Sequence, residues 1–475
     1  MVFTSLHFVV FFAVVYALYR VLPHRLQNWM LLSASYYFYA SWDWRFLSLL
    51  LGSTIVDFLV GRYLGREDVP QPKRRLALVI SLVFNLGMLG IFKYFGFFER
   101  SLIALAGWFG WHIDGVTLNV ILPIGISFYT FMTISYVIDV YRREIRPTAH
   151  LFDFALFVAY FPHLVAGPIL RASLLLPQIE RPRLVTVEKV AGGLWLVGWG
   201  CFQKMFVADN LAPLVDTVFG ASATPTGADV LVAAWAFAFQ IYGDFAGYSN
   251  IARGVSRMMG IELNVNFRFP YFVISPQEFW RHWHISLSTW LRDYLYIPHG
   301  GNRHGTWQTS RNLFITMALG GLWHGAAWTF VIWGLYQGGA LVVGRSIEQW
   351  ARRAGVAVRH GLSVPRLLLG IVMFQVTCYG WLIFRADSFA QLSRLSQLLF
   401  TDFRVTATTL DSLLLPLLQF VTPLLVVHIY QARHDSEDAP LGLPILVRYA
   451  LYGAVFYCVL LWGDFAGAQF IYFQF

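Results

Sequence analysis

The chain has 475 residues, of which 57% are hydrophobic and 13% are charged. Its mean hydropathy of +0.57 is far higher than a water-soluble globular fold needs, so we exclude that class and expect a polytopic membrane protein. Lysine and arginine outnumber aspartate and glutamate by 35 to 26, and the basic residues cluster in short connections between apolar runs. This distribution is typical of cytoplasmic loops and argues against nucleic-acid binding.

Apolar runs with the length of membrane helices follow one another along the whole chain. Some are short or contain glycine, and a crossing needs about 20 residues, so we predict about 11 full crossings plus re-entrant and interfacial pieces. We expect one all-α integral membrane domain over residues 1–475, with a motif core near 120–344 and further spans in 345–475. The candidate spans are 2–19, 26–42, 46–61, 76–95, 116–141, 151–165, 192–207, 230–248, 312–325, 326–344, 367–384, 413–430 and 445–462.

The charges and cysteines around these spans give three further expectations. The first span lacks the basic flank and cleavage site of a signal peptide, so we expect it to be retained. If the arginine-rich connections that follow the spans ending at 19, 61 and 141 are cytoplasmic, the N-terminus faces outward. Cys201, Cys378 and Cys458 lie in apolar runs without metal-ligand spacing, so we expect buried thiols.

Two apolar runs, around residues 161–168 and 240–250, contain ionisable residues. His163 stands between Pro162 and Pro168, a pattern that predicts a turn at a break in a membrane helix. Asp244 and Tyr248 lie in a run that its glycines would interrupt. Because an unpaired carboxylate would be costly there, we expect Asp244 to pair with an arginine or to line a polar cavity, with a purely structural ion pair as the alternative.

The stretch from residue 275 to about 296 has the pattern of an amphipathic helix. Ser275, Pro276 and Glu278 form a capping box at its start, and His284 falls on the border between its two faces. We expect this helix to lie in the membrane interface, because its polar face would be costly in lipid. The predicted apolar arc consists of Phe279, Trp280, Trp283, Leu287, Trp290, Leu291 and Tyr294, and the polar face consists of Arg281, His282, Ser286, Ser288, Arg292 and Asp293.

The next long apolar run, 312–344, has no charged residue and contains His324 after the glycine pair at 320 and 321. The glycines indicate a broken or tightly packed helix, and an ionisable residue at membrane depth indicates a functional site. A neutral imidazole can take a proton from a hydroxyl that attacks an acyl carbon, and a second polar group can orient it. His324 and His284 are therefore the candidate catalytic residues, with packing or hydrogen bonding as the alternative role of each. We expect no bound metal. A metal site built from His282, His284, His299 and His304 is disfavoured, because these histidines lack the i, i+4 spacing of a helical pair.

Several of these stretches resemble the signatures of the membrane-bound O-acyltransferase (MBOAT) family, most closely its alginate O-acetylation branch. The sequence departs from the family pattern at His282, where arginine is common, and at His163 and Met132, where glutamine is common. The matching stretches are FWRHWHISLS (279–288), WLRDY (290–294), GGNR (300–303) and GGLWHGA (320–326), and upstream 122–131, 138–142, 166–169 and 244–249.

The resemblance implies a multi-helix fold around a central funnel, with the essential histidine of the family at His324 and its second histidine at His284. It also implies acyl transfer in the bacterial inner membrane from a cytoplasmic thioester, usually acetyl-CoA, with no permanently bound cofactor. The acetyl group would reach an exported polysaccharide through a periplasmic partner acetyltransferase of the SGNH/GDSL serine-hydrolase type and the machinery that makes and exports the polymer. We expect the donor's phosphates to meet Arg281, Arg292, Arg303 and Asn302, and the substrate path to include Asp244, Tyr248 and Trp323.

The residues leave other functions open. A non-catalytic transporter of a small solute or acyl donor would also use glycine-broken spans with a buried carboxylate, although no inverted repeat is visible in the sequence. Within the family, D-alanyl transfer from a carrier-protein thioester and a covalent acyl intermediate are further possibilities. The sequence does not identify the acceptor polymer.

Overall fold

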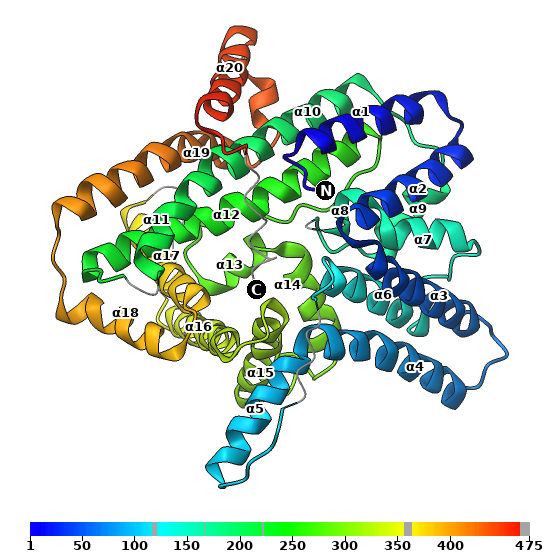
Figure 1. Ribbon diagram of the computed structural model, residues 1–475, viewed down its shortest axis with the longest axis horizontal. Helices are drawn as coiled ribbons and strands as arrows, with labels where there is room; N and C mark the ends of the chain where they lie inside the picture. Colours follow the sequence, from blue (N-terminus) through cyan, green and yellow to red (C-terminus); the bar gives the residue numbers. More distant parts are fainter. Residues whose placement is uncertain (116–120, 166, 221–222, 356–362, 466–475) are drawn as a thin grey trace. The chain divides into compact units, whose positions relative to one another are not determined.

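The computed structural model describes residues 1–115, 121–165, 167–220, 223–355 and 363–465. Within these ranges the chain consists of helices and connections, so the all-α prediction is confirmed (Figure 1). The chain divides into two compact units, of which unit 1 combines residues 1–193 and 252–264, and unit 2 combines residues 194–251 and 265–475. The single domain expected over residues 1–475 stays a prediction.

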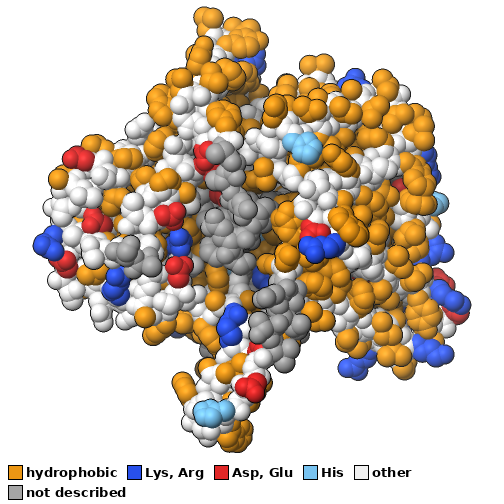
Figure 2. Space-filling view, in the orientation of Figure 1, with side chains coloured by type: hydrophobic (Ala, Val, Ile, Leu, Met, Phe, Trp, Pro, Cys, Tyr) orange, Lys and Arg blue, Asp and Glu red, His pale blue; other side chains and the backbone are white. Residues whose placement is uncertain are grey.

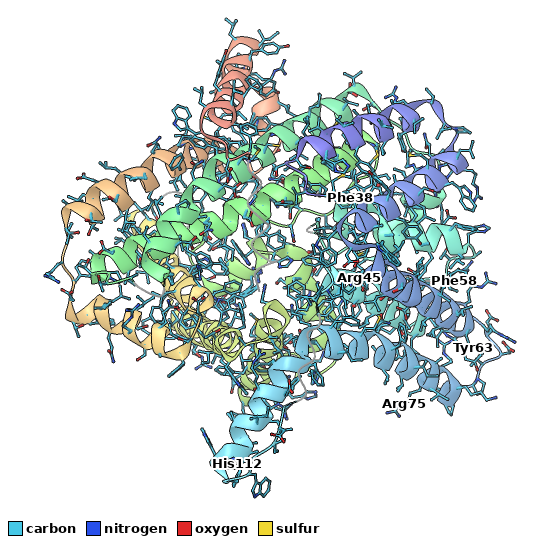
Figure 3. All side chains as sticks on the ribbon, in the orientation of Figure 1. Phe38, Arg45, Phe58, Tyr63, Arg75 and His112 are labelled. Carbon is cyan, nitrogen blue, oxygen red and sulfur yellow. The ribbon has the colours of Figure 1, made fainter. Side chains whose placement is uncertain are left out.

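Unit 1 is built mainly from the N-terminal helices. Its helices α3 and α4 form a hairpin, and Figure 3 places Tyr63 and Arg75 at the end where they join and Arg45 at the other end of α3. Unit 1 contains α1 (Leu6–Val21), α2 (His24–Asp43), α3 (Leu47–Leu64), α4 (Gln71–Leu89), α5 (Phe95–Trp108), α6 (Ile126–Tyr141), α7 (Leu151–Ala159), α8 (Phe161–Leu164), α9 (Ala172–Glu180), the first part of α10 (Val187–Cys201) and the last part of α12 (Gly227–Met258).

A buried polar cluster joins α3, α4 and α6 in unit 1. The carboxylate of Asp57, with 0% of the residue exposed, accepts hydrogen bonds from Ser81 Oγ at 2.5 Å and from Asn85 Nδ2 at 2.8 Å. Thr133 Oγ1 on α6 donates to Asn85 Oδ1 at 3.3 Å. Because a buried carboxylate is costly without partners, this network fixes how the three helices pack.

Unit 2 contains the later helices and several π-helical turns. All three cysteines are free, and the expected burial holds for Cys378, whereas Cys201 and Cys458 are half-buried. Beside the rest of α10 and α12, unit 2 contains a π-helix (Phe202–Ala208), α11 (Asp209–Phe219), α13 (Pro276–His282), α14 (Ile285–Leu291), a π-helix (Arg292–Tyr296), α15 (Thr306–His324), α16 (Trp328–Arg353), α17 (Val364–Arg385), α18 (Phe389–Thr401), α19 (Leu415–Arg433) and α20 (Ile445–Trp462).

Helix α12 runs unbroken through the glycines that were expected to interrupt it. A Cβ atom on Gly243 would lie 2.7 Å from the Gln203 carbonyl oxygen, and one on Gly247 would lie 2.7 Å from the Gly200 carbonyl oxygen. These glycines let α12 approach α10 and the following π-helix closely, as small residues spaced by four do in membrane helices. The prediction of a broken span is therefore wrong, because the glycines serve helix packing.

Six helical stretches of the described chain are long and apolar enough to cross a membrane, and α1 is a shorter apolar helix. The predicted span 445–462 coincides with α20, and the span 116–141 corresponds to α6, although its first five residues lie outside the described part. The span 151–165 is divided between α7 and α8, and the turn between them precedes Pro162, which confirms the predicted break. Apolar side chains cover much of the face shown in Figure 2, and no residue of α20 is buried, as expected for lipid-facing helices.

Candidate active site

The helix predicted from Ser275 begins as expected but ends early. Ser275 Oγ accepts a hydrogen bond from Glu278 N at 3.2 Å, and Glu278 Oε2 accepts one from Ile274 N at 2.9 Å, so the cap at its start is confirmed. The predicted continuation to about Tyr296 as one helix is wrong, because α13 and α14 are separate helices. The π-helix follows α14 directly.

The break between α13 and α14 turns two neighbouring side chains inward. In one continuous helix, Trp283 and His284 would point about 100° apart, which placed His284 at the border between the faces. In the structure Trp283 is extended (φ −109°, ψ 127°), His284 is left-handed (φ 41°, ψ 54°), and their exposed fractions are 1% and 0%. Every residue of the predicted apolar arc is buried, which confirms that side of the amphipathic pattern, whereas Ser286 of the predicted polar face is buried as well. Trp283 packs on Trp381 of α17 at 4.7 Å between ring centroids. The expected position of α13 and α14 at the membrane interface stays a prediction.

Asn266, which the sequence analysis did not select, holds the backbone after this break. Its carbonyl oxygen accepts a hydrogen bond from Ile285 N at 2.8 Å, and its Oδ1 accepts from Ser286 Oγ at 2.9 Å. Its Nδ2 donates to Ser249 Oγ on α12 at 3.2 Å. No motif or spacing in the sequence marks this asparagine, because its role depends on contacts between distant segments.

His324 is the last residue of α15 and is 3% exposed. The glycine pair predicted either a broken helix or tight packing. Helix α15 runs unbroken through Gly320 and Gly321, so the glycines serve tight packing. A Cβ atom on Gly321 would lie 2.1 Å from the Phe330 carbonyl oxygen on α16. This close approach places His324 directly against α16, with Trp333 edge-on at 5.0 Å between ring centroids.

The structure brings the two predicted catalytic histidines together. The ring centroids of His284 and His324 lie 6.3 Å apart. The predicted path residue Trp323 contacts both, at 5.8 Å from His284 and 5.1 Å from His324. Residues forty positions apart in the sequence thus form one pair inside unit 2.

Aromatic rings from other elements enclose this pair. Phe245 of α12 lies edge-on to His284 at 4.6 Å between ring centroids, and Phe384 of α17 lies edge-on to His324 at 5.5 Å. Neither ring nitrogen of His284 has a hydrogen-bond partner among the described residues. Burial lowers the pKa of His284, which lies outside the six stretches long enough to cross a membrane, from 6.5 to about 3. His284 therefore stays neutral near pH 7, and its lone pair and N–H are available inside a dry enclosure.

Asp244 forms an ion pair with a lysine, a partner that the sequence analysis did not select. Lys204 Nζ lies 2.6 Å from Asp244 Oδ1 and 2.7 Å from Asp209 Oδ1, and its side chain is 2% exposed. Lys204 Nζ also lies 5.7 Å from the ring centroid of Tyr248, the other path candidate on α12. The sequence did hold a signal, since Lys204 is the one charged residue in the span 192–207 and such a lysine needs an acidic partner. These contacts agree with the structural ion pair that was the alternative role of Asp244.

The four residues expected to meet the donor's phosphates are all exposed: Arg281, Arg292, Asn302 and Arg303. Arg292 pairs with its neighbour Asp293, with 2.6 Å between Nε and Oδ1. Their role stays a prediction. Among the described residues, no group of three or more His, Cys, Asp or Glu side chains could hold a metal ion.

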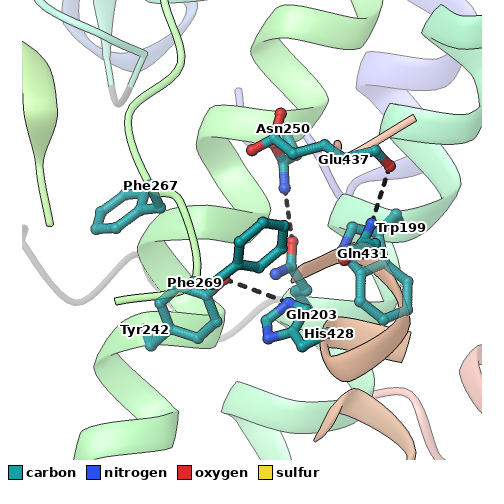
Figure 4. A pocket seen from close by; sticks show the side chains of 9 residues that line it. All are labelled: Trp199, Gln203, Tyr242, Asn250, Phe267, Phe269, His428, Gln431 and Glu437. Atoms are coloured by element: carbon teal, nitrogen blue, oxygen red, sulfur yellow. Dashed lines mark hydrogen bonds between the residues drawn. The ribbon is translucent and has the colours of Figure 1, made fainter. Parts of the chain in front are cut away.

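Phe267, whose ring also contacts His284, is one of the residues that line a small polar pocket (Figure 4). Its cavity of about 10 Å³ approaches the space that one water molecule needs. Figure 4 shows three hydrogen bonds among its lining residues: Asn250 Nδ2 to Gln203 Oε1 at 2.8 Å, Tyr242 Oη to His428 Nε2 at 3.3 Å, and Gln431 Nε2 to the Glu437 carbonyl oxygen at 2.9 Å. The remaining lining residues beside Phe267 are Trp199 and Phe269.

With this geometry in view, we compared the chain with known proteins. Residues 53–384 match the model of the membrane-bound O-acyltransferase family, MBOAT. The chain belongs to this family. The family relationship makes it a multi-pass membrane enzyme that transfers an acyl group to oxygen and requires an acyl donor.

Relatives within the MBOAT family cover most of the chain. A protein of Azotobacter vinelandii named "Probable alginate O-acetylase AlgI" is 42% identical over 462 residues, which are 93% of this chain and 90% of that protein. A protein of the same name from Pseudomonas aeruginosa is 44% identical over 402 residues, 84% of this chain and 75% of that protein. The "Peptidoglycan O-acetyltransferase" of Helicobacter pylori is 35% identical over 386 residues, 76% of this chain and 71% of that protein. The resemblance read from the motifs is confirmed.

Proposed function

We propose that this protein is an acetyltransferase of the bacterial inner membrane that uses acetyl-CoA for the O-acetylation of an exported polysaccharide such as alginate. The observation that carries the proposal is the buried pair of His284 and His324, with ring centroids 6.3 Å apart, in a member of an O-acyltransferase family. The names of the alginate and peptidoglycan relatives support a polysaccharide as the final acceptor. We also infer about 11 crossings around a central funnel, because one crossing of a bilayer needs about 20 apolar residues.

In the proposed reaction His324 is the general base. A hydroxyl oxygen attacks the carbonyl carbon of the thioester, the new C–O bond forms, and the C–S bond breaks. His324 takes the proton of the hydroxyl and delivers it to the departing sulfur, so that a thiol leaves and no other reactant is needed. The position of His324 at the C-terminal end of α15 favours the imidazolium that forms in between, because the helix dipole is negative there.

The neutral ring of His284 has a supporting role in this proposal. It lies close enough to orient His324 or the substrate and to donate a hydrogen bond to the developing oxyanion. The enclosing rings of Phe245, Trp333 and Phe384 exclude water, which strengthens such a hydrogen bond and limits hydrolysis of the thioester.

The remaining parts of the proposal concern the donor and the partners. The exposed side chains of Arg281, Arg292, Arg303 and Asn302 would bind the phosphates of acetyl-CoA on the cytoplasmic side. A periplasmic acetyltransferase of the serine-hydrolase type would receive the acetyl group and pass it to the polymer. A carrier-protein thioester, as in D-alanyl transfer, is the alternative donor.

The experiment uses the purified protein in liposomes with radiolabelled acetyl-CoA on one side and a mannuronate oligosaccharide, with or without the periplasmic partner, on the other. We expect release of free CoA together with label on the oligosaccharide or the partner. Movement of label without thioester cleavage would instead identify a transporter, and cleavage only with a charged carrier protein would identify the alternative donor.

A further inference from the structure

The backbone on both sides of His284 is tied to one short segment, residues 266–268. Before the histidine, the carbonyl oxygen of His282 accepts a hydrogen bond from Arg268 N at 2.9 Å. After it, Ile285 N donates to the Asn266 carbonyl oxygen at 2.8 Å. The histidine is therefore held between two backbone hydrogen bonds to the same neighbouring segment.

The side chain of Asn266 adds further hydrogen bonds, which a residue without this amide group would not make. Its Oδ1 accepts from both Ser286 N at 3.3 Å and Ser286 Oγ at 2.9 Å, and its Nδ2 donates to Ser249 Oγ of α12 at 3.2 Å. Asn266 is 1% exposed, so water does not compete for these bonds. Asn266 thereby connects the first turn of α14 to α12, the helix that also carries Phe245 against the His284 ring.

His284 occupies a backbone conformation that needs such support. Its φ of 41° lies in the left-handed region, which β-carbon-bearing residues rarely adopt. Strained conformations of this kind persist where the surroundings over-determine them, and they are common at functional sites. Both nitrogens of the His284 ring lack a hydrogen-bond partner among the described residues, so no side-chain hydrogen bond fixes this ring directly.

We propose that Asn266 is a positioning residue that sets the His284 ring against His324 by fixing the backbone conformation at the break between α13 and α14. The proposal rests on the proposed function, in which His284 assists His324. It adds a residue outside both histidine motifs, and it predicts that Asn266 acts on catalysis through His284.

The test compares Asn266→Ala with Asn28→Ala in the full-length protein in liposomes. Asn28 is a matched control in unit 1, because it is 6% exposed and its Nδ2 donates to Asp153 Oδ1 at 3.2 Å and to the Ile179 carbonyl oxygen at 2.9 Å. Turnover per folded protein is measured as CoA release from acetyl-CoA with a mannuronate oligosaccharide as acceptor, and stability as the thermal midpoint. We expect kcat of Asn266→Ala to fall on the order of tenfold to a hundredfold with KM values nearly unchanged, because small displacements of a reacting group have effects of this size.

A double-mutant cycle with His284→Ala measures whether the kcat loss of Asn266→Ala depends on His284. A merely structural role of Asn266 would give no such dependence. If Asn266 acts through His284, the double variant has the same kcat as His284→Ala alone. Ser286→Ala, which removes one of the two bonds to Asn266 Oδ1, serves as a milder variant if Asn266→Ala folds poorly, and we expect a several-fold loss with the same dependence on His284.

Two results would overturn the proposal. One is an Asn266→Ala variant that loses stability as Asn28→Ala does but keeps the wild-type kcat per folded protein. The other is a double variant in which the losses of Asn266→Ala and His284→Ala multiply. Both results leave the proposed function in place as long as acyl transfer depends on His324. Failure of the Asn266 proposal can therefore be told apart from failure of the proposed function.

Discussion

The ring of Phe267 lies nearly parallel to the ring of His284, with 6.3 Å between the centroids and 19° between the planes. Phe267 also lines the polar pocket that contains Gln203, Asn250 and His428. One phenyl ring therefore contacts His284 and also lines a space that approaches the size of a water molecule. Phe267 also contacts Phe245 at 5.0 Å, so it belongs to the aromatic enclosure as well.

We predict that Phe267→Ala lets water reach the thioester. Removing a ring that touches both His284 and the pocket would open space between them, and CoA release without acceptor should rise several-fold while acetylation of the acceptor falls. Phe269→Ala is the matched control, since Phe269 lines the same pocket and its contact there is with His428. Equal rates of acceptor-independent CoA release in wild type and Phe267→Ala would contradict this role.

Lys204→Met should destabilise unit 2 strongly. The change leaves Asp209 and Asp244 buried beside each other without their shared counter-ion, and breaking such a group costs about 3–5 kcal/mol. We expect a thermal midpoint in detergent that is lower by several degrees and a smaller folded yield. Lys73→Met, at an exposed position, is the control, and the same midpoint for both variants would show that the cluster is not structural.

Gly321→Ala should displace His324. The added Cβ atom would meet the Phe330 carbonyl oxygen at 2.1 Å, and overpacking of this kind typically costs about 1–3 kcal/mol. Acyl transfer should fall more than the amount of folded protein, because α15 must move away from α16. Gly453→Ala in α20, where no atom lies within 4 Å of the added Cβ, should be neutral, and equal behaviour of the two variants would refute the packing argument.

The lowered pKa of His284 predicts an acid-sensitive contribution to stability. Burial lowers this pKa from 6.5 to about 3, so between these values the unfolded state binds a proton that the folded state does not. This contribution is fully present above pH 6.5 and is lost as the pH falls towards 3, at up to about 1.4 kcal/mol per pH unit. His284→Asn, which tolerates the left-handed backbone, should flatten the fall of the thermal midpoint below pH 6.5. Identical slopes in wild type and variant would contradict the shift.

Much of the fold and the central pair could be predicted from the sequence because they depend on local patterns. The apolar runs gave the helices, as the agreement between 445–462 and α20 shows. The uncharged surroundings of His324 marked it as an ionisable residue at membrane depth, whereas the amphipathic pattern placed His284 only at the border between two faces. The family motifs then gave the two histidines related roles, and the structure brings their rings to 6.3 Å between centroids.

The errors concern features that depend on packing between distant segments. The capping box at Ser275 correctly marked a helix start, but no local signal showed that Trp283 and His284 would both turn inward and end that helix. Glycines in α12 were interpreted as helix breakers, although they serve close approach to α10. Asn266 was missed for the same reason, since its partners lie twenty residues after it and seventeen before it.

The most direct test of the account is acyl transfer by His324→Ala, with His112→Ala as the control. His112 is exposed, as Figure 3 shows, and takes no part in the enclosure. Both variants are assayed at equal amounts of membrane protein for CoA release and for label on the acceptor. We predict full activity in His112→Ala and none above background in His324→Ala, because in the proposed reaction His324 takes the proton of the attacking hydroxyl. Acceptor labelling by His324→Ala at the wild-type rate would contradict the account.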